Sequence, residues 1–308
     1  MRLTLCLAAL LLVVGSYAQS LHQAAAQGDL ERVKAALKGA NLEALDDEGQ
    51  TPLIAAAAGG HKAVVDELLR AGAKVETPDS EGATALMFAA SEGHLSIVEA
   101  LAAKGANVRA KSLLGMTALH WSAEGGHLPV VQFLIKKGAQ PAAKDVAGQA
   151  ALHYAALSGH VAVIKALLEA GAAVDDADAT GLTPLMLAAA EAKTPAVTAL
   201  LSAKANPAAR DKLGMTALIH TASALEEEGV PSGKARAEIA GLLLAKHPQV
   251  NETDRQGRTA LMYAALMGHT ELVSKLLALK ADKSIKDKDG RTALDHAKSP
   301  EVARLLKG

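Results

Sequence analysis

Histidines are the residues of this chain that could most readily bind a metal ion, because it has eleven of them and one cysteine. Eight occupy two repeated settings. The first group follows a glycine: His61, His94, His127, His160 and His269. The second follows a leucine: His22, His120 and His153. These repeated histidines have two interpretations: a row of metal-binding sites, or a structural hydrogen bond made once per repeat. No HExxH spacing or cysteine cluster accompanies the histidines, so we favour the hydrogen bond and predict no metal site.

Other catalytic patterns are weaker. The segment GVPSGKA at residues 229–235 is one residue short of a phosphate-binding loop and lacks the following Ser or Thr. No GxSxG motif is present. Carboxylates recur at one turn position, where an aspartate stabilises the turn: Asp46, Asp79, Asp145, Asp178, Asp211, Asp254 and Asp287. We therefore expect no catalytic residue, no cofactor and no enzymatic activity, and a metal-dependent enzyme is the weakest alternative.

The composition favours closely packed helices. Half of the 308 residues are apolar, yet only 2% are aromatic. The 32 basic and 33 acidic residues nearly cancel, so the chain lacks the basic surface that nucleic acids or anionic membranes attract. We expect neither as a partner.

The first eighteen residues have the pattern of a secretory signal peptide. Arg2 supplies the positive region, an apolar stretch follows, and the small residues around Ala18 suit cleavage after that residue. Cleavage would also remove Cys6, the only cysteine. An uncleaved membrane anchor is the alternative, although the apolar stretch is short for one. We expect a periplasmic or extracellular protein with no membrane contact after cleavage.

A period of 33 residues organises the rest of the chain. It is marked by glycines that each precede a segment such as TPL or TAL: Gly49, Gly82, Gly115, Gly148, Gly181, Gly214, Gly257 and Gly290. Only the interval from Gly214 to Gly257 is longer, at 43 residues. One unit cannot bury its own apolar face, so neighbouring units must stack.

Each period predicts two short helices. In the second unit, Thr51 and Pro52 suit the N-cap and first turn of a helix over residues 53–58. Gly60 ends that helix, and the apolar spacing that follows predicts a second helix ended by Gly72.

These units resemble ankyrin repeats in segments such as TPLIAAAAGGH, TALMFAASEGH, TALHWSAEGGH and TALMYAALMGH. The resemblance implies an all-α solenoid of about nine helix-turn-helix units joined by hairpin-like finger loops. After the signal peptide (1–18), we expect a single domain over 19–308. Its parts are an N-terminal half-repeat (20–45), repeats (46–286), a C-terminal cap (287–308) and an inserted exposed loop at about 224–235.

Two repeats depart from the pattern. Repeat five has Ala150 where a threonine should cap, so its first helix should be the softest. Repeat six lacks the Gly-His pair, and Thr194-Pro195 offers a substitute start for its second helix.

The finger tips change in character along the chain. They are taken as the two residues before each repeated glycine and the one after it. Those of repeats two and three are mainly acidic, including Asp47, Glu48 and Glu81, and those of repeats eight and nine are mainly basic. Apolar tips fall between: Leu113, Leu114, Met116, Val146, Leu182, Leu213 and Met215. They indicate either an interaction surface or packing between neighbouring fingers.

A second row lies on the first helices, where one position carries Phe88, Trp121 and Tyr154 in successive repeats. Packing between repeats and contact with a partner both explain large side chains there.

The resemblance implies a non-enzymatic scaffold, here a monomer, that binds a protein through the concave face and finger tips of its central repeats. The hypothetical contacts are Phe88, Trp121, Tyr154 and the seven apolar tips. There are two alternatives: a periplasmic support factor for a catalase-like enzyme, a role that some bacterial ankyrin proteins resemble, or a secreted effector acting on a host.

Overall fold

The computed structural model describes residues 21–225 and 233–308, which divide into two compact units at the Val146–Ala147 bond. As expected, the described chain is all-α. Its only β pairing is an isolated bridge between Thr253 and Thr259. The predicted signal peptide lies outside the described residues, as does most of the predicted loop at 224–235. Whether 19–308 form a single domain stays a prediction.

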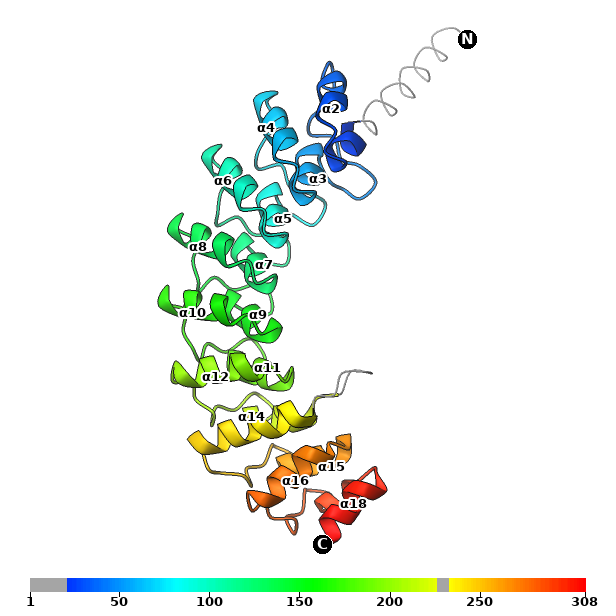
Figure 1. Ribbon diagram of the computed structural model, residues 1–308, viewed down its shortest axis with the longest axis vertical. Coiled ribbons are helices and arrows are strands. Elements are labelled where there is room, and N and C mark those ends of the chain that lie inside the picture. The colour runs from blue at the N-terminus through cyan, green and yellow to red at the C-terminus, as the bar shows by residue number, and fades with distance from the viewer. Residues whose placement is uncertain (1–20, 226–232) are drawn as a thin grey trace, which may run out of the picture. The chain divides into compact units, whose positions relative to one another are not determined.

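The first unit is a stack of helix pairs that follow a helical stretch at residues 21–26. Its further helices are α2 (Leu30–Ala36), α3 (Pro52–Ala58), α4 (Lys62–Arg70), α5 (Ala85–Ser91), α6 (Leu95–Ala103), α7 (Ala118–Glu124) and α8 (Leu128–Lys136). Figure 1 shows α3, α5 and α7 in one row, with α4, α6 and α8 in a second row beside them. We call the members of the first row first helices and those of the second row second helices.

The second unit repeats this arrangement. Its helices are α9 (Ala151–Ser158), α10 (Val161–Glu169), α11 (Pro184–Ala190), α12 (Thr194–Ser202), α13 (Ala217–Ser223), α14 (Gly233–Lys246), α15 (Ala260–Met267), α16 (Thr270–Ala278), α17 (Ala293–His296) and α18 (Pro300–Lys307). First helices are α9, α11, α13, α15 and α17. No helix in the described parts of either unit combines the length and the hydrophobicity needed to cross a bilayer.

Local sequence explains where the helices begin and end. The hydroxyl of Thr51 accepts a hydrogen bond from the backbone N–H of Ile54, 3.2 Å away, and caps α3. Pro52 occupies the first turn, where its missing N–H costs nothing. Gly60 takes a φ of 75° at the end of the helix, a conformation that side chains disfavour.

Small residues form the contact between successive first helices. Ala56 and Ala57 of α3 are fully buried, as are Ala89 and Ala90 of α5. The second helices add larger apolar side chains, such as Leu68 of α4, which is also inaccessible. Alanines let the first helices approach closely, so a core with few aromatic residues is still well packed.

Both departures from the repeat are visible in the structure. Helix α12 begins at Thr194, as predicted, although Lys193 and not the threonine is its N-cap residue. Ala150 has the extended backbone of an N-cap residue but no side-chain oxygen to accept a bond. That this makes α9 the softest first helix remains a prediction. The inserted segment ends sooner than expected, because α14 starts at Gly233.

Candidate functional site

Each finger is a tight turn held by its repeated aspartate. In repeat two, the backbone N–H of Asp46 donates to the carbonyl of Gln50, 3.0 Å away. The Asp46 carboxylate accepts from the N–H groups of Glu48 and Gln50. This arrangement fixes the backbone and points residues 47 and 48 toward solvent. The turn-stabilising role predicted for the aspartates is confirmed here.

Neighbouring fingers are joined by backbone hydrogen bonds. In the first unit, the N–H of Leu113 donates to the carbonyl of Glu81, and the N–H of Val146 donates to that of Leu114, both at 2.9 Å. In the second unit, the N–H of Lys212 bonds the carbonyl of Thr180 at the same distance. The fingers of repeats three to five in the first unit, and those of the second unit, therefore form rows in which side chains take no part in these bonds.

Apolar side chains project from this row. Leu113 is 74% exposed, Leu114 58% and Val146 70%, and Leu213 in the second unit is similarly exposed. They account for four of the seven large exposed hydrophobic residues in the described chain. Side-chain packing between fingers does not explain such exposure, so the interaction-surface interpretation is favoured for these four residues.

The residue after each repeated glycine behaves differently. Met215 is only 7% exposed, and Met116 and Leu182 are half-buried. The prediction that Met215 is an exposed tip contact is therefore wrong, and Met116 and Leu182 are only partly available. The carbonyls of these three residues accept the hydrogen bond that closes their own finger. They therefore lie on the return arm of the turn, which runs back to the first helix.

Phe88 on α5 and Trp121 on α7 form an edge-to-face aromatic pair. Their ring centroids are 5.3 Å apart and the ring planes cross at 84°. Both side chains are half-buried, and the indole N–H of Trp121 is inaccessible with no acceptor among the described residues. Packing between repeats therefore accounts for much of each ring, while the remaining exposed part is open to a partner. Tyr154 on α9 is likewise half-buried.

In the last three repeats, the same helix position bonds to the finger of its own repeat. His220 Nε2 lies 2.9 Å from the Asp211 carboxylate, the Tyr263 hydroxyl donates to Asp254 across 2.8 Å, and His296 Nε2 lies 2.7 Å from Asp287. We did not anticipate these pairs from the sequence. A constant spacing of nine residues between an aspartate and a His or Tyr was the available signal.

These contacts and burial shift several pKa values. Burial lowers the pKa of His153 and also that of His220, where it outweighs the attraction of Asp211. Burial alone would raise the pKa of Asp287, but hydrogen bonds from the Arg291 N–H and the His296 ring hold it down, at about 2. Burial and the hydrogen bond to Asp254 raise the pKa of Tyr263. All of these shifts follow from contacts that hold the repeats together.

The histidines that follow glycine make structural hydrogen bonds. The ring Nε2 of His61 lies 2.9 Å from the carbonyl of Ala26 in the preceding repeat. His94, His127 and His269 repeat this contact with the carbonyls of Ala58, Ser91 and Ala224. Within residues 21–225 and 233–308, no group of three potential metal-binding side chains occurs. The repeated hydrogen bond expected from the sequence is confirmed at these four positions.

A buried arginine was missed by the sequence analysis. Arg236 on α14 donates to the carbonyls of Ala190 at 3.0 Å, Thr221 at 2.9 Å and Leu225 at 3.3 Å. Ala190 occupies the same place in its repeat as Ala58, whose carbonyl accepts from His94. Arg236 therefore supplies a donor in a repeat without the Gly-His pair. It lies next to the irregular insertion, so no periodic pattern could reveal it.

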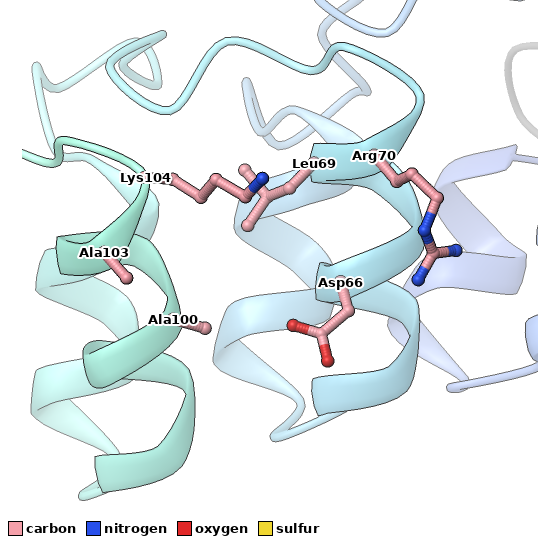
Figure 2. A pocket seen from close by; sticks show the side chains of 6 residues that line it. All are labelled: Asp66, Leu69, Arg70, Ala100, Ala103 and Lys104. Carbon is pink, nitrogen blue, oxygen red and sulfur yellow. The ribbon is translucent and has the colours of Figure 1, made fainter.

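A shallow cavity of about 320 Å³ lies between the second helices α4 and α6. Figure 2 shows the Asp66 side chain of α4 facing Ala100 of α6, while the Arg70 side chain of α4 points away from α6. None of the predicted contact residues lines this cavity. It therefore does not belong to the candidate site, which remains the row of fingers together with the first-helix aromatics.

Comparison with protein families identifies the repeats. A family model described as "Ankyrin repeats (3 copies)" matches residues 21–112, 109–178 and 232–308, and one described as "Ankyrin repeat" matches residues 180–212. Together these matches cover most of the chain, including all the residues of the candidate site except Leu213 and Met215.

Individual relatives match over short segments. The human NAD-capped RNA hydrolase NUDT12 is 48% identical over 61 residues, 20% of this chain and 13% of that protein. Oxysterol-binding protein-related protein 1 of Mus musculus is 40% identical over 73 residues, 23% of this chain and 8% of the relative. Protein LHCP TRANSLOCATION DEFECT of Arabidopsis thaliana is 48% identical over 48 residues, which are 16% of this chain and 27% of that protein. The chain spans so little of each relative that none of their activities is carried over.

Proposed function

This chain belongs to the ankyrin-repeat proteins, and on that premise we propose that it is a non-enzymatic scaffold that binds a protein partner outside the cytoplasm. The observation that carries the proposal is the exposure of Leu113, Leu114 and Val146 on fingers whose mutual backbone bonds do not involve these side chains. Apolar side chains that the fold does not need are candidates for burial against a partner.

The aromatic pair gives the same surface a rigid component. Phe88 and Trp121 are fixed against each other, so little side-chain entropy would be lost when a partner covers their exposed parts. Rigid aromatic anchors are common among the residues that dominate binding energies. The exposed apolar tips and this pair together make the contact surface that we propose for the first unit.

Affinity capture from the native source tests the proposal. The variant Leu113→Ser, Leu114→Ser, Val146→Ser should lose the partner that the wild-type protein retains, with little change in melting temperature because these side chains are exposed. Leu225→Ser, at an exposed leucine outside the fingers, is the matched control and should retain it. Equal capture by the triple variant and the wild type would refute the proposed surface.

Action outside the cytoplasm is supported only by the pattern of residues 1–18. Cell fractionation, followed by mass analysis of the mature N-terminus, tests it. We expect a chain that starts after Ala18 and is found in the periplasm or the medium. A full-length chain in the cytoplasm would contradict this part of the proposal.

A further inference from the structure

The first unit carries a contiguous row of fingers whose surface chemistry changes from one end to the other. The fingers approach so closely that a methyl group on Gly49 would lie 2.5 Å from the hydroxyl of Ser80 in the next finger. A methyl group on Gly82 would lie 3.0 Å from the backbone nitrogen of Leu113, and one on Gly115 would lie 3.1 Å from that of Val146. The tips of repeats two to five therefore follow one another without a gap.

One end of this row is acidic. Asp47, Glu48 and Glu81 are exposed, and none of their carboxylates has an ion-pair or hydrogen-bond partner within the part of the chain that the structure describes. The aspartates that hold the turns, Asp46 and Asp79, instead have their carboxylates turned to backbone N–H groups. The three tip carboxylates are therefore not needed to build the fingers.

The other end of the row is apolar. Leu113 and Leu114 come directly after the acidic finger, because the N–H of Leu113 bonds the carbonyl of Glu81. Val146 follows Leu114 through the second such bond. Unpaired negative charge and exposed apolar surface are thus adjacent and ordered along one line.

We infer that the fingers of the first unit bind an extended polypeptide segment with Lys or Arg residues at one end and aliphatic or aromatic residues at the other. This inference rests on the proposed function and adds the chemistry of the partner. Stacked repeats are separated by roughly 10 Å, the distance between packed helices. An extended chain in the polyproline II conformation has three residues per turn and rises about 3.1 Å per residue, so every third residue of the segment faces a new finger. The four fingers then span about ten residues of the segment. Of the four positions that face a finger, two are basic, at the acidic end, and two are apolar, at the apolar end.

Selection from a library of random ten-residue peptides on the immobilised full-length protein tests this chemistry. We expect enrichment of peptides with two or more Lys or Arg residues toward one end and apolar residues toward the other. A selected peptide should then bind the variant Asp47→Asn, Glu48→Gln, Glu81→Gln on the order of tenfold more weakly than the wild type, from the loss of three exposed charge pairs. Raising the salt concentration should weaken wild-type binding in the same direction.

The second unit provides the matched control. Lys212→Gln, Arg255→Gln, Lys288→Gln removes three exposed finger charges of opposite sign and should leave binding of the selected peptide unchanged within twofold. Selected peptides without basic residues, or equal binding to the acidic-end variant, would overturn the inference. If the native partner still depended on Leu113, Leu114 and Val146, the proposed function would stand while this inference failed.

Discussion

The ring of His153 closes the first turn of α9 by accepting a hydrogen bond at Nδ1 from the backbone N–H of Ala150, across 3.1 Å. Its other nitrogen, Nε2, lies 3.3 Å from the carbonyl of Leu182, to which it donates. The ring must therefore be neutral with its proton on Nε2, since a proton on Nδ1 would face the N–H of Ala150.

A pH dependence of stability follows from this geometry. The pKa of His153 is lowered by burial, so between that value and 6.5 the unfolded chain binds more protons than the folded one. The stabilising contribution is present above pH 6.5 and is lost as the pH falls below it. The melting temperature should therefore drop between pH 7.5 and 5.5, and His153→Gln should reduce that drop. A drop of the same size in the wild type and in His153→Gln would contradict this account.

Ala150 is the position where a larger side chain should stabilise the protein. Thr51 and Thr183 at the equivalent position accept a hydrogen bond from the helix N-terminus, which an alanine cannot do. Ala150→Thr should raise the free energy of unfolding by about 1 kcal/mol, the usual value of an N-cap. Urea denaturation measures this difference. If the free energy of unfolding does not rise, the His153 ring already provides the hydrogen bonding that stabilises the helix N-terminus.

Two glycines with the same backbone angle φ allow the cost of conformational strain in a Gly→Ala substitution to be distinguished from the cost of steric contact. Gly171 and Gly181 both have a φ of 90°. A methyl group on Gly171 would meet nothing within 4 Å, whereas on Gly181 it would lie 2.9 Å from the backbone nitrogen of Lys212. Gly171→Ala should cost about 1–2 kcal/mol from the left-handed conformation alone. Gly181→Ala should cost about 1–3 kcal/mol more through overpacking. Equal losses of unfolding free energy in the two variants would refute close finger contact.

Arg236 should be essential for the stability of its repeat. Replacing it by methionine removes the donor to three carbonyls, and we expect a loss of about 2–4 kcal/mol in unfolding free energy, since groups left buried without partners are costly. Lys234→Met, an exposed position on the same helix, is the control and should change stability by about 0.5 kcal/mol or less. A loss for Arg236→Met no larger than that of the control would contradict the proposed role of the arginine.

Much of this fold could be predicted because the period repeats the same local chemistry. Thr51, Pro52, Gly60 and His61 each mark a helix boundary by their own backbone or side-chain preferences. The exposure of Leu113 could be predicted for the same reason, since the turn fixes the direction of the residues before its glycine. Met215 was misjudged because the return arm of a turn is adjacent in sequence to its tip yet faces the helices.

The remaining features depend on tertiary contacts. Burial of Arg236 follows from carbonyls contributed by two repeats, which no single period contains. The edge-to-face packing of Phe88 on Trp121 depends on how far one first helix is displaced relative to the next. The nine-residue pairs such as Tyr263 with Asp254 were open to detection, because both residues belong to one repeat.

Because the bonds between fingers use backbone atoms, the stability of this surface does not depend on the tip side chains that determine its binding selectivity. Leu113 is joined to Glu81 through backbone atoms, which every amino acid except proline supplies alike. The tip side chains can therefore be exchanged without weakening the row that presents them. Mutation can thus revise the identity of the bound partner one finger at a time while the scaffold stays intact. For the same reason, the chain is a suitable framework for engineering new recognition.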